Sequence, residues 1–487
     1  MHSSTGPWPL DRSARQKEGV KPKTKSRERQ GPERLVAQIA DIHRPHLKKN
    51  DEEETMTRIL RQATIASTIA VLAGLMPAQA SDYNWKRNQG TTVRFFVNNN
   101  SLGVALAAKK AEFEKLTGIT LKADMYQEPQ LRQRLLTVMN ARSDEVDVFM
   151  TLPSREGQQF ATAGWVADLT KRLKEDVAPD YKPDDLSKAL LEAGTFSGKV
   201  TSLPMNIEGP LLYWRKDIFA KCKIEAPKRL DDLATAAEAI AKCDQSITPY
   251  VSRGLRPALA YTYSNFLHNM GGTYIKDGKS NLCSPAASQA LELYSRLLRD
   301  FGPPGVVNYS FQQISSFYGA GRVAMAFESS NQLSIFMEDP ARLKDTSVMP
   351  LPAGSAGSVP TTIGWGIAVS PFSKNADAAW LFVQWATSPA TQKALALEGI
   401  APPRASVATS TEYQAWINEH EVRKEWQAAL RVLADKGTSE VGYPIVANPQ
   451  SRDFIGQAVI DLLLKKKTVE QACADADKGL DELIAQK

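Results

Sequence analysis

The fold is decided by residues 91–150, which read TTVRFFVNNNSLGVALAAKKAEFEKLTGITLKADMYQEPQLRQRLLTVMNARSDEVDVFM. β-Branched and aromatic residues predict three strands, at 91–97, 119–125 and 146–150. Between the strands, apolar residues recur at helical spacing in 102–116 and 130–140. The first helix should end at Thr117-Gly118, because glycine is typical of a helix C-terminus. This alternation of strand and helix indicates a parallel sheet covered by helices.

Ligands of parallel α/β sheets bind beyond the carboxyl ends of the strands. Two polar loops occupy that position here, Asn98 to Ser101 and Thr151 to Gly157. The same mixture of strand and helix patterns recurs later in the chain. We expect further strands at 211–214, 323–327, 346–350 and 363–370, and further helices at 231–242, 285–300, 376–387, 454–464 and 469–484. Residues 352–361 are rich in Pro, Gly and Ser, which predicts a linker or a crossing between domains.

Residues 56–80 have the features of a secretory signal peptide. Arg58 and Arg61 precede an apolar run from Ala63 to Met76, and Ala78-Gln79-Ala80 is a small-x-small cleavage site. We expect cleavage after Ala80 and export to the periplasm. The alternative is a single membrane anchor, although the apolar run is short for a bilayer span.

The segment 1–55 precedes that signal and is polar, charged and aperiodic. It is either a disordered extension or the product of a start codon assigned too early. The acidic stretch DEEE at 51–54, just before Met56, has purine-rich codons typical of a ribosome-binding sequence. We therefore favour Met56 as the true start.

The composition excludes several classes of function. With 487 residues the chain is too long for one ordinary domain. Residues 81–487 carry 46 Lys and Arg against 45 Asp and Glu, so no basic surface favours a nucleic-acid partner. The sequence has no GxxxxGK[ST] phosphate loop and no GxSxG nucleophile motif. Only two of the five histidines, His268 and His420, lie beyond the first 55 residues. We therefore expect no cofactor, no metal site, no catalytic residues and no enzymatic activity.

The four cysteines lack the CxxC spacing of zinc or redox sites. Reduced buried thiols are one interpretation. In an exported protein, a Cys222–Cys243 disulfide is the other, because the pair would close a short loop in an oxidising compartment.

Seven short motifs, in one fixed order, resemble the family 1 extracellular solute-binding proteins, the maltose-binding-like components of carbohydrate ABC importers. The resemblance covers residues 91–487. Its motifs are FATAGWVADL at 160–169, GKV at 198–200 with LP at 203–204 and LLYWRKDIF at 211–219, GG at 271–272, FYGAGRVAM at 317–325, GWGIAV at 364–369, GIAPPR at 399–404 and TVEQA at 468–472. Each motif alone is weak evidence for the family. The seven motifs in the family's order, behind a signal peptide, are together a specific resemblance.

The resemblance implies an α/β, two-lobed periplasmic-binding-protein fold (type II). Each lobe would be a mainly parallel sheet flanked by helices, with the ligand cleft between the lobes. Lobe one would hold residues 91–206 with 363–403, and lobe two 210–360 with 404–487. The expected function is capture of a small carbohydrate or polyol by hinge closure and delivery to the permease subunits of an ABC importer. The expected oligomeric state is a monomer.

Sugar binding requires planar polar groups for hydroxyls and aromatic faces for C–H patches. Asn98 and Asn100 follow the first strand, although either could instead cap the next helix. Ser154 and Arg155 lie in the loop after the third strand, where a simple surface loop is the alternative. The resemblance adds Glu208 at the proposed crossing and Trp365 between two glycines. It also adds the following ligand-contacting candidates: Tyr261, Tyr263, Asn331, Arg404, Tyr443 and Arg452.

Two other classes of function stay open. One is a binding protein for a non-sugar solute, such as a polyamine, an organic anion or iron, for which Tyr261 and Tyr263 are candidate ligands. The other is a secreted glycoside hydrolase, which needs two carboxylates across a cleft. Acidic residues are available, but no motif selects a pair.

Overall fold

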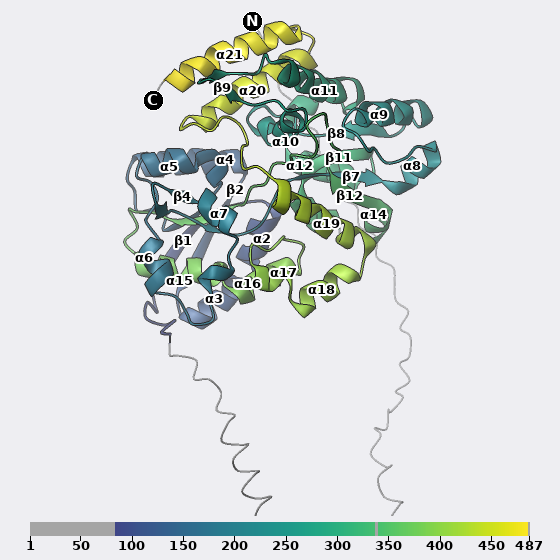
Figure 1. Cartoon of the computed structure of the whole chain (residues 1–487). Helices are drawn as coiled ribbons and strands as arrows, with labels where there is room; N and C mark the ends of the chain where they lie inside the picture. The colour runs from purple at the N-terminus through teal and green to yellow at the C-terminus, as the bar shows by residue number, and fades with distance from the viewer. Residues whose placement is uncertain (1–82, 337–338, 486–487) are drawn as a thin grey trace, which may run out of the picture. The chain divides into compact units, whose positions relative to one another are not determined.

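A computed structural model describes residues 83–336 and 339–485. The expectations for residues 1–55 and for the signal peptide at 56–80 lie outside the described residues. The described chain contains two main sheets, each with its own helices (Figure 1). We call them the first and the second lobe.

The sheet of the first lobe has five strands in the order β2-β1-β3-β13-β6. β1, β2 and β3 pair in parallel, as the alternation of strands and helices predicts. The strands are β1 (Thr92–Asn98), β2 (Thr120–Tyr126), β3 (Val148–Thr151), β6 (Leu203–Pro204) and β13 (Gly366–Val369). The helices are α2 (Ser101–Ala108), α3 (Lys110–Thr117), α4 (Glu128–Asn140), α5 (Gln158–Thr162), α6 (Thr170–Glu175), α7 (Lys188–Ala193), α15 (Ala376–Ala386) and α16 (Pro389–Ala396).

The single helix expected at 102–116 is two helices, α2 and α3, divided at Lys109. Lys109 leaves the helical conformation, with φ −90° and ψ 6°. The helical spacing of apolar residues continues across the break, and so it could not reveal the division. Gly118 ends α3 with a φ of 69°, a left-handed conformation that favours glycine, as predicted.

The sheet of the second lobe has four strands in the order β12-β7-β11-β8. They are β7 (Pro210–Arg215), β8 (Thr248–Val251), β11 (Val323–Ser329) and β12 (Thr346–Pro350). The helices are α8 (Lys216–Cys222), α9 (Asp232–Cys243), α10 (Arg256–Asn269), α11 (Pro285–Phe301), α12 (Phe311–Gly319), α13 (Leu333–Phe336), α14 (Pro340–Asp345), α17 (Ala405–Ala408), α18 (Thr411–Asn418), α19 (Glu421–Lys436), α20 (Asn448–Leu463) and α21 (Val469–Ala485). Two small hairpins complete the fold: β4 (Thr195–Phe196) with β5 (Lys199–Val200), and β9 (Ile275–Lys276) with β10 (Lys279–Ser280).

Each sheet contains one strand that runs against the others. In the first sheet this strand is β13, which is antiparallel to both β3 and β6. In the second sheet it is β7, which is antiparallel to both β11 and β12, whereas β8 and β11 are parallel. β7 and β13 are the strands that follow the first two of the three crossings between lobes. The reversal therefore marks where the chain enters each sheet from the other lobe.

Two separate hydrophobic cores match the two sheets. The first is centred on β1, β3 and α15, and the second on β7, β11, α10 and α11. Tyr261 of α10 and Val441 are exceptions, because they pack with the first core although they belong to the second lobe. The lobes thus touch at these residues.

The first two crossings run side by side. The backbone N–H of Glu208 donates to the carbonyl of Ile363 at 2.8 Å, and the N–H of Ile363 donates to the carbonyl of Glu208 at 2.7 Å. The side chain of Asn206 accepts a further bond from the Trp365 N–H at 2.8 Å. This pairing holds residues 206–208 and 363–365 in a fixed register.

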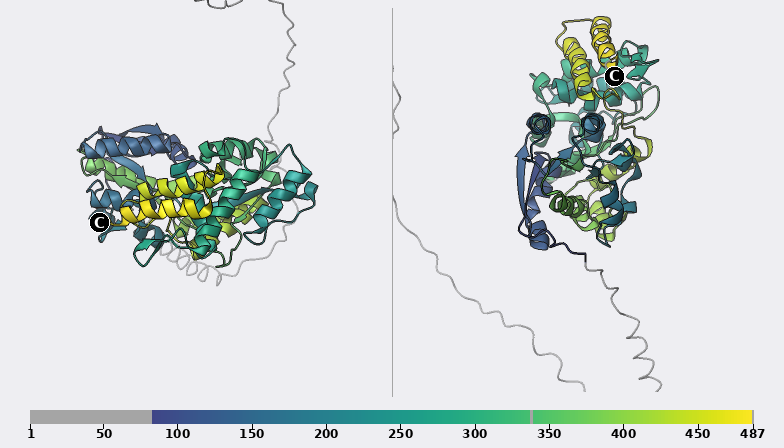
Figure 2. Two further views of the ribbon diagram at one scale, coloured as in Figure 1. Left: turned by 90° about the horizontal axis from the view of Figure 1, so that it is seen from above. Right: turned by 90° about the vertical axis from the view of Figure 1, so that its left-hand side faces the viewer.

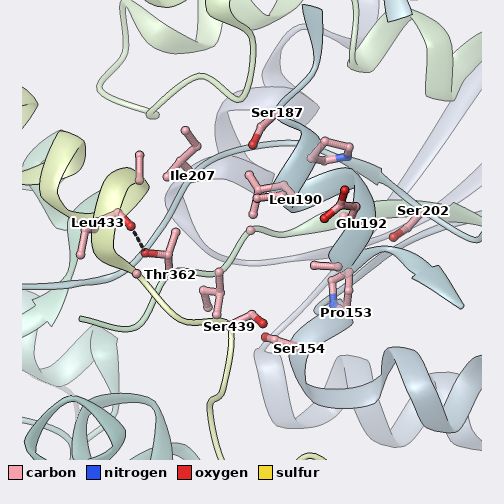
Figure 3. A pocket seen from close by; sticks show the side chains of 18 residues that line it. Pro153, Ser154, Ser187, Leu190, Glu192, Ser202, Ile207, Thr362, Leu433 and Ser439 are labelled. Carbon is pink, nitrogen blue, oxygen red and sulfur yellow. Dashed lines mark hydrogen bonds between the residues drawn. The ribbon is translucent and has the colours of Figure 1, made fainter. Parts of the chain in front are cut away.

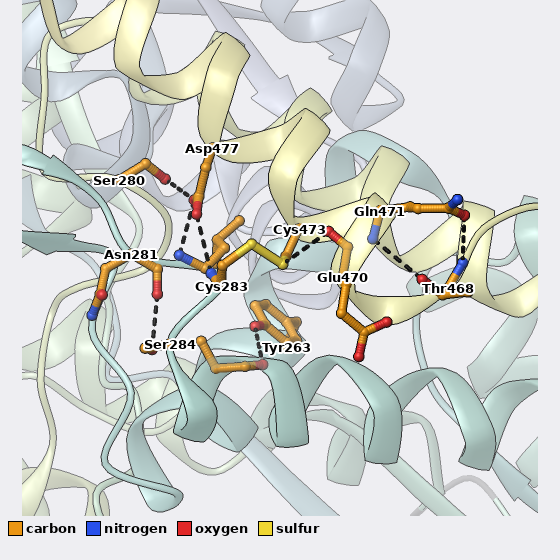
Figure 4. Close-up of a disulfide and its surroundings, with 12 residues drawn as sticks. Tyr263, Ser280, Asn281, Cys283, Ser284, Thr468, Glu470, Gln471, Cys473 and Asp477 are labelled. Carbon is orange, nitrogen blue, oxygen red and sulfur yellow. Dashed lines mark hydrogen bonds between the residues drawn. A yellow bond between two sulfur atoms is a disulfide. The ribbon is translucent and has the colours of Figure 1, made fainter.

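Two disulfides lie in the second lobe. Cys222 is bonded to Cys243, which joins α8 to α9. A second bond joins Cys283, before α11, to Cys473 of α21 (Figure 4). Beside it, Asp477 accepts hydrogen bonds from the backbone N–H groups of Leu282 and Cys283. The second disulfide thus secures α21, which lies beside α20 in both views of Figure 2.

None of the helices within residues 83–336 and 339–485 is both long enough and apolar enough to span a bilayer.

Candidate functional site

A narrow cavity lies where the crossings meet the carboxyl ends of β1 and β3. Both lobes contribute to its wall. The first lobe supplies Asn100, Ser101, Glu128, Leu152 and Trp365, and the crossings supply Glu208 and Ile363. The second lobe supplies Arg253, Ala258, Tyr261, Phe311, Ser329, Asn331, Gln332 and Arg452.

Glu208 is the centre of the polar network in this cavity. Its Oε1 accepts hydrogen bonds from the Tyr261 hydroxyl at 3.0 Å and the Ser329 hydroxyl at 2.9 Å. Its Oε2 accepts from the side-chain amides of Asn331 at 2.8 Å and Asn206 at 3.2 Å. Burial raises the pKa of Glu208, while these donors and Arg253 act in the opposite direction. The carboxyl group therefore ties the crossing to α10 and to the end of β11.

A buried ion pair lies next to Glu208. The Nε of Arg253 donates to both carboxylate oxygens of Glu328, at 3.1 and 3.0 Å, and its Nη2 donates to Oε1. The guanidinium carbon lies 4.1 Å from the centre of the Tyr261 ring. This cation–π contact fixes the tyrosine ring in the cavity wall.

A second charge network lies on the first-lobe side. Arg132 of α4 pairs with Glu128 at 2.8 Å and with Glu156, and Arg155 reaches Glu128 at 3.4 Å. Burial alone would raise the pKa of Glu128, but Arg132, Arg155 and Arg253 outweigh it and lower the pKa to about 2. The guanidinium of Arg132 also lies 5.7 Å from the Trp365 ring. The network therefore supports the aromatic wall of the cavity.

Several buried polar atoms, in the cavity lining (Asn331) or beside it (Ser330 and Asn98), have no partner among the described residues. The Oδ1 of Asn331, the Oγ of Ser330 and both side-chain polar atoms of Asn98 form no hydrogen bond there. A buried polar group without a partner costs stability, so such groups usually serve a ligand or a water molecule. Hydroxyl groups, which both donate and accept, suit this set.

The structure brings six of the residues expected from the sequence to this cavity: Asn100, Glu208, Tyr261, Asn331, Trp365 and Arg452. Asn100 also caps α2, because its Oδ1 accepts from the Gly103 N–H at 2.8 Å. The two interpretations of Asn100 are thus compatible.

Three expected residues, Tyr263, Arg404 and Tyr443, lie away from this cavity. Tyr263 stands two positions after Tyr261 on α10, so it points to the opposite face of the helix and packs in the second core. Arg404 is buried against the first lobe, where it donates to the carbonyls of Thr387 and Lys182. Tyr443 is buried against the Ser280 hydroxyl.

Three further candidates lie near the cavity but do not line it. Asn98 ends β1 and is fully buried behind the wall. Ser154 and Arg155 lie in a turn of π-helix, Pro153–Gly157, and face a neighbouring groove on the other side of the crossings. Arg155 acts on the cavity through its ion pair with Glu128.

The sequence interpretation missed Arg253, Phe311, Ser329 and Gln332. Arg253 follows the four-residue strand β8, which was too short to be recognised, and so its strand-end position was not apparent. Ser329 is the last residue of β11, and Gln332 follows Asn331 in the turn after that strand. The rule that ligands gather beyond strand ends would have selected Arg253, Ser329 and Gln332 if β8 and the end of β11 had been placed correctly. It gives no signal for Phe311, which begins α12.

A larger hollow of about 440 Å³ lies on the opposite face of the crossings (Figure 3). Side chains of a strand alternate between faces, and accordingly Ile207 lines this hollow while Glu208 lines the cavity. Among its lining residues only Glu192 is ionisable. Convergent polar groups and shifted pKa values favour the smaller cavity as the functional site.

Within residues 83–336 and 339–485 no three His, Cys, Asp or Glu side chains gather in a group suited to a metal ion.

Comparison with known proteins gives consistent matches. The family model for bacterial extracellular solute-binding proteins matches residues 98–393. A mannitol-binding protein of Pseudomonas aeruginosa is 26% identical over 332 residues, which are 65% of this chain and 74% of that protein.

Two solved structures share the fold. An ABC transporter solute-binding protein of Agrobacterium radiobacter K84, in complex with ribitol, has a TM-score of 0.74 and 23% identity, and the match covers 81% of this chain and 99% of that one. One from Thermotoga lettingae TMO, bound to α-D-tagatose, has a TM-score of 0.72 and 21% identity, with coverage of 81% and 100%. The two-lobed fold of periplasmic binding proteins, type II, is thereby confirmed.

Proposed function

The chain belongs to the bacterial extracellular solute-binding proteins, and on this premise we propose that it captures a small carbohydrate or polyol and delivers it to an ABC importer. One observation carries the proposal. The cavity between the lobes combines the aromatic rings of Trp365, Tyr261 and Phe311 with polar groups arranged around Glu208. Aromatic faces pack on the C–H patches of a polyol, and the polar groups bind its hydroxyls.

The named ligands of similar proteins support a small hydroxylated ligand. The relative from Pseudomonas aeruginosa is named for mannitol, and the two structural neighbours hold ribitol and tagatose. Each is a single short molecule with a hydroxyl on most of its carbons. Asn331 and Gln332, which line the cavity, are polar residues suited to such a ligand.

The two lobes move relative to each other when a ligand enters the cavity. The free volume between the cavity side chains is only about 30 Å³, which is less than a polyol requires. The side-chain amide of Gln312 in α12 donates to the side-chain oxygen of Gln127 beside α4, which joins the two lobes next to the cavity residues Phe311 and Glu128. A ligand therefore enters when the lobes separate about the paired crossings, and it is enclosed when they return.

The lobe boundaries follow from the crossings. Lobe one comprises residues 91–206 with 363–403, and lobe two comprises 210–360 with 404–487. The protein acts as a monomer in the periplasm after cleavage behind Ala80, and its partners are the permease subunits of the importer. The closed lobes present a composite surface that the permease can distinguish from the open form.

No catalytic step is part of this function. A glycoside hydrolase needs one free acid and one free base or nucleophile. Here Glu128 and Glu328 are paired with arginines, and Glu208 is held by four donors. The arginines at the cavity also disfavour a polyamine, because like charges repel.

Thermal unfolding against a panel of alditols, sugars, polyamines and ferric chelates tests the proposal. A ligand that binds only the folded state raises the melting temperature with the logarithm of its concentration. We expect a shift with an alditol or a sugar, and a much smaller shift in Trp365→Ala. A shift with amines or iron alone would keep the fold and overturn the ligand class.

A further inference from the structure

The positive charges at one end of the cavity are not fully balanced. Three guanidinium groups, those of Arg132, Arg155 and Arg452, lie in one cluster with two buried carboxylates, Glu128 and Glu156. A third carboxylate, that of Asp453, also acts on Arg155, but it is half-exposed and already paired with Arg256. Both buried carboxylates are already shared by Arg132, and Glu128 is also the partner of Arg155. The cluster therefore carries one surplus positive charge.

Arg452 is the member that faces the cavity without a counter-ion. It is 2% exposed and lines the cavity wall from α20. Its Nε donates to Asn448 Oδ1 at 3.2 Å and its Nη2 to the Val441 carbonyl at 3.1 Å. In the described part of the chain its Nη1 forms no hydrogen bond, and no carboxylate lies within ion-pair distance of the side chain.

The unbalanced positive charge affects the pKa values of the arginines. Burial, together with the neighbouring Arg155 and Arg132, lowers the pKa of Arg452 well below its usual range. Burial and Arg132 likewise lower the pKa of Arg155 to about 10. A buried cation in such surroundings gains stability when an anion is placed beside it.

The other charged groups of the cavity do not supply that anion. Glu328 is bound bidentately by Arg253. Glu208 accepts its hydrogen bonds from neutral donors, and burial raises its pKa. The cation that acts on Glu208 is Arg253, not Arg452. The cavity thus has one end suited to hydroxyl groups, around Glu208 and Asn331, and one end suited to an anion, at Arg452.

We propose that the preferred ligand is a sugar acid, a short polyhydroxylated chain with one carboxylate, whose carboxylate pairs with Arg452 while its hydroxyls contact Glu208 and Asn331. This inference rests on the proposed function and narrows its ligand class. A guanidinium matches the planar carboxylate geometrically. A single surplus charge suits a carboxylate better than a phosphate ester, which carries close to two negative charges.

Calorimetric titration of the purified protein with matched pairs tests the inference. D-Mannonate and D-mannitol, and likewise D-gluconate and D-glucitol, differ only in the carboxylate at one end. We expect at least one hexonate to bind ten-fold or more tightly than its hexitol. This comparison uses the unmodified protein, so it does not depend on whether any variant folds.

The variant Arg452→Gln locates the effect. Its hexonate affinity should fall more than its hexitol affinity, so that their ratio approaches one. Arg296→Gln, which alters a half-exposed arginine of α11 that pairs with Asp300 and does not line the cavity, should keep the ratio of the unmodified protein. An unchanged ratio in Arg452→Gln would overturn the role of Arg452.

Failure of this inference is distinguishable from failure of the proposed function. A hexitol or neutral sugar that binds as tightly as its acid would overturn the inference and leave the proposed function intact. If hexonates, hexuronates and all neutral counterparts fail to bind, both are overturned.

Discussion

Glu208 and Ile363 exchange both of their backbone hydrogen bonds, at 2.8 and 2.7 Å, at the point where the two crossings pass each other. The same Glu208 directs its carboxylate into the cavity, where it accepts four hydrogen bonds. One residue thus belongs both to the hinge between the lobes and to the site. Occupation of the site and the angle between the lobes are therefore coupled through it.

The close approach of the crossings predicts that Gly209→Ala impairs the hinge. A Cβ at Gly209 would lie 2.4 Å from the carbonyl oxygen of Thr361, so the crossings would have to separate. We expect a loss of about 1–3 kcal/mol in unfolding free energy and weaker ligand binding, measured by urea unfolding and calorimetry. Gly319→Ala, where a Cβ meets nothing within 4 Å, is the matched control. Equal stability and affinity in the two variants would contradict the hinge assignment.

Two tyrosines of α10 provide a matched pair for the site. Tyr261→Phe removes a hydroxyl that donates to Glu208, and a hydrogen bond to a buried carboxylate contributes about 1.5–3 kcal/mol. We expect ligand affinity to fall about ten-fold or more. Tyr263→Phe removes a 3.4 Å contact with the Ala287 carbonyl in the core and should leave affinity unchanged. Equal effects on affinity would show that the cavity wall has been assigned wrongly.

Much of the fold was predictable from the sequence because apolar residues recur at the spacing of strands or of helices. The parallel strands β1, β2 and β3 lie within two residues of their expected positions. The residues of α10 carried no such signal, since the helix is buried on all sides and its buried residues include polar ones such as Ser264 and Asn265. For this reason Tyr263 was grouped with Tyr261, although they lie on opposite faces.

The ion pairs of Glu128 predict that the free energy of unfolding falls at acidic pH. The pKa of Glu128 is about 2 in the folded protein and near 4.5 when unfolded. A lowered carboxylate pKa gives stability that is complete above pH 4.5 and is lost as the pH falls toward 2. The loss should be about 3 kcal/mol, measured by urea unfolding between pH 6 and 2.5.

Glu128→Gln tests the source of this acid sensitivity. The variant should be less stable at pH 6, because Arg132 and Arg155 lose a partner, and its stability should fall less steeply below pH 4.5. Glu398→Gln, which removes a half-exposed carboxylate paired with Lys109, should keep the steep fall. An identical pH profile in the Glu128 variant and the unmodified protein would contradict the assignment.

The two disulfides should stabilise the protein unequally. Cys222 and Cys243 are 21 residues apart, whereas Cys283 and Cys473 are 190 apart. In the loop-entropy account the shorter loop contributes about 3 kcal/mol and the longer about 5 kcal/mol. We expect Cys283→Ser with Cys473→Ser to lower the melting temperature more than Cys222→Ser with Cys243→Ser. The reverse order would show that α21 is held mainly by its other contacts, such as those of Asp477.

Long-range features of the site could not be read from local patterns. Nothing near Cys283 indicates Cys473, because their proximity depends on how α21 packs on the second lobe. The helix expected at 454–464 leaves out Arg452, whereas α20 begins at Asn448 and carries it. The charge balance that surrounds Arg452 joins residues of both lobes, and only the folded structure brings them together.

A crystal structure of the protein with its tightest-binding sugar, polyol or sugar acid tests the central claim most directly. We predict that the ligand lies between the lobes, with its carbon chain against Trp365 and its polar groups bonded to Glu208, Asn331 and Arg452. A ligand found instead in the larger hollow beside Ser187 and Ser439, or on the surface of one lobe, would contradict the account.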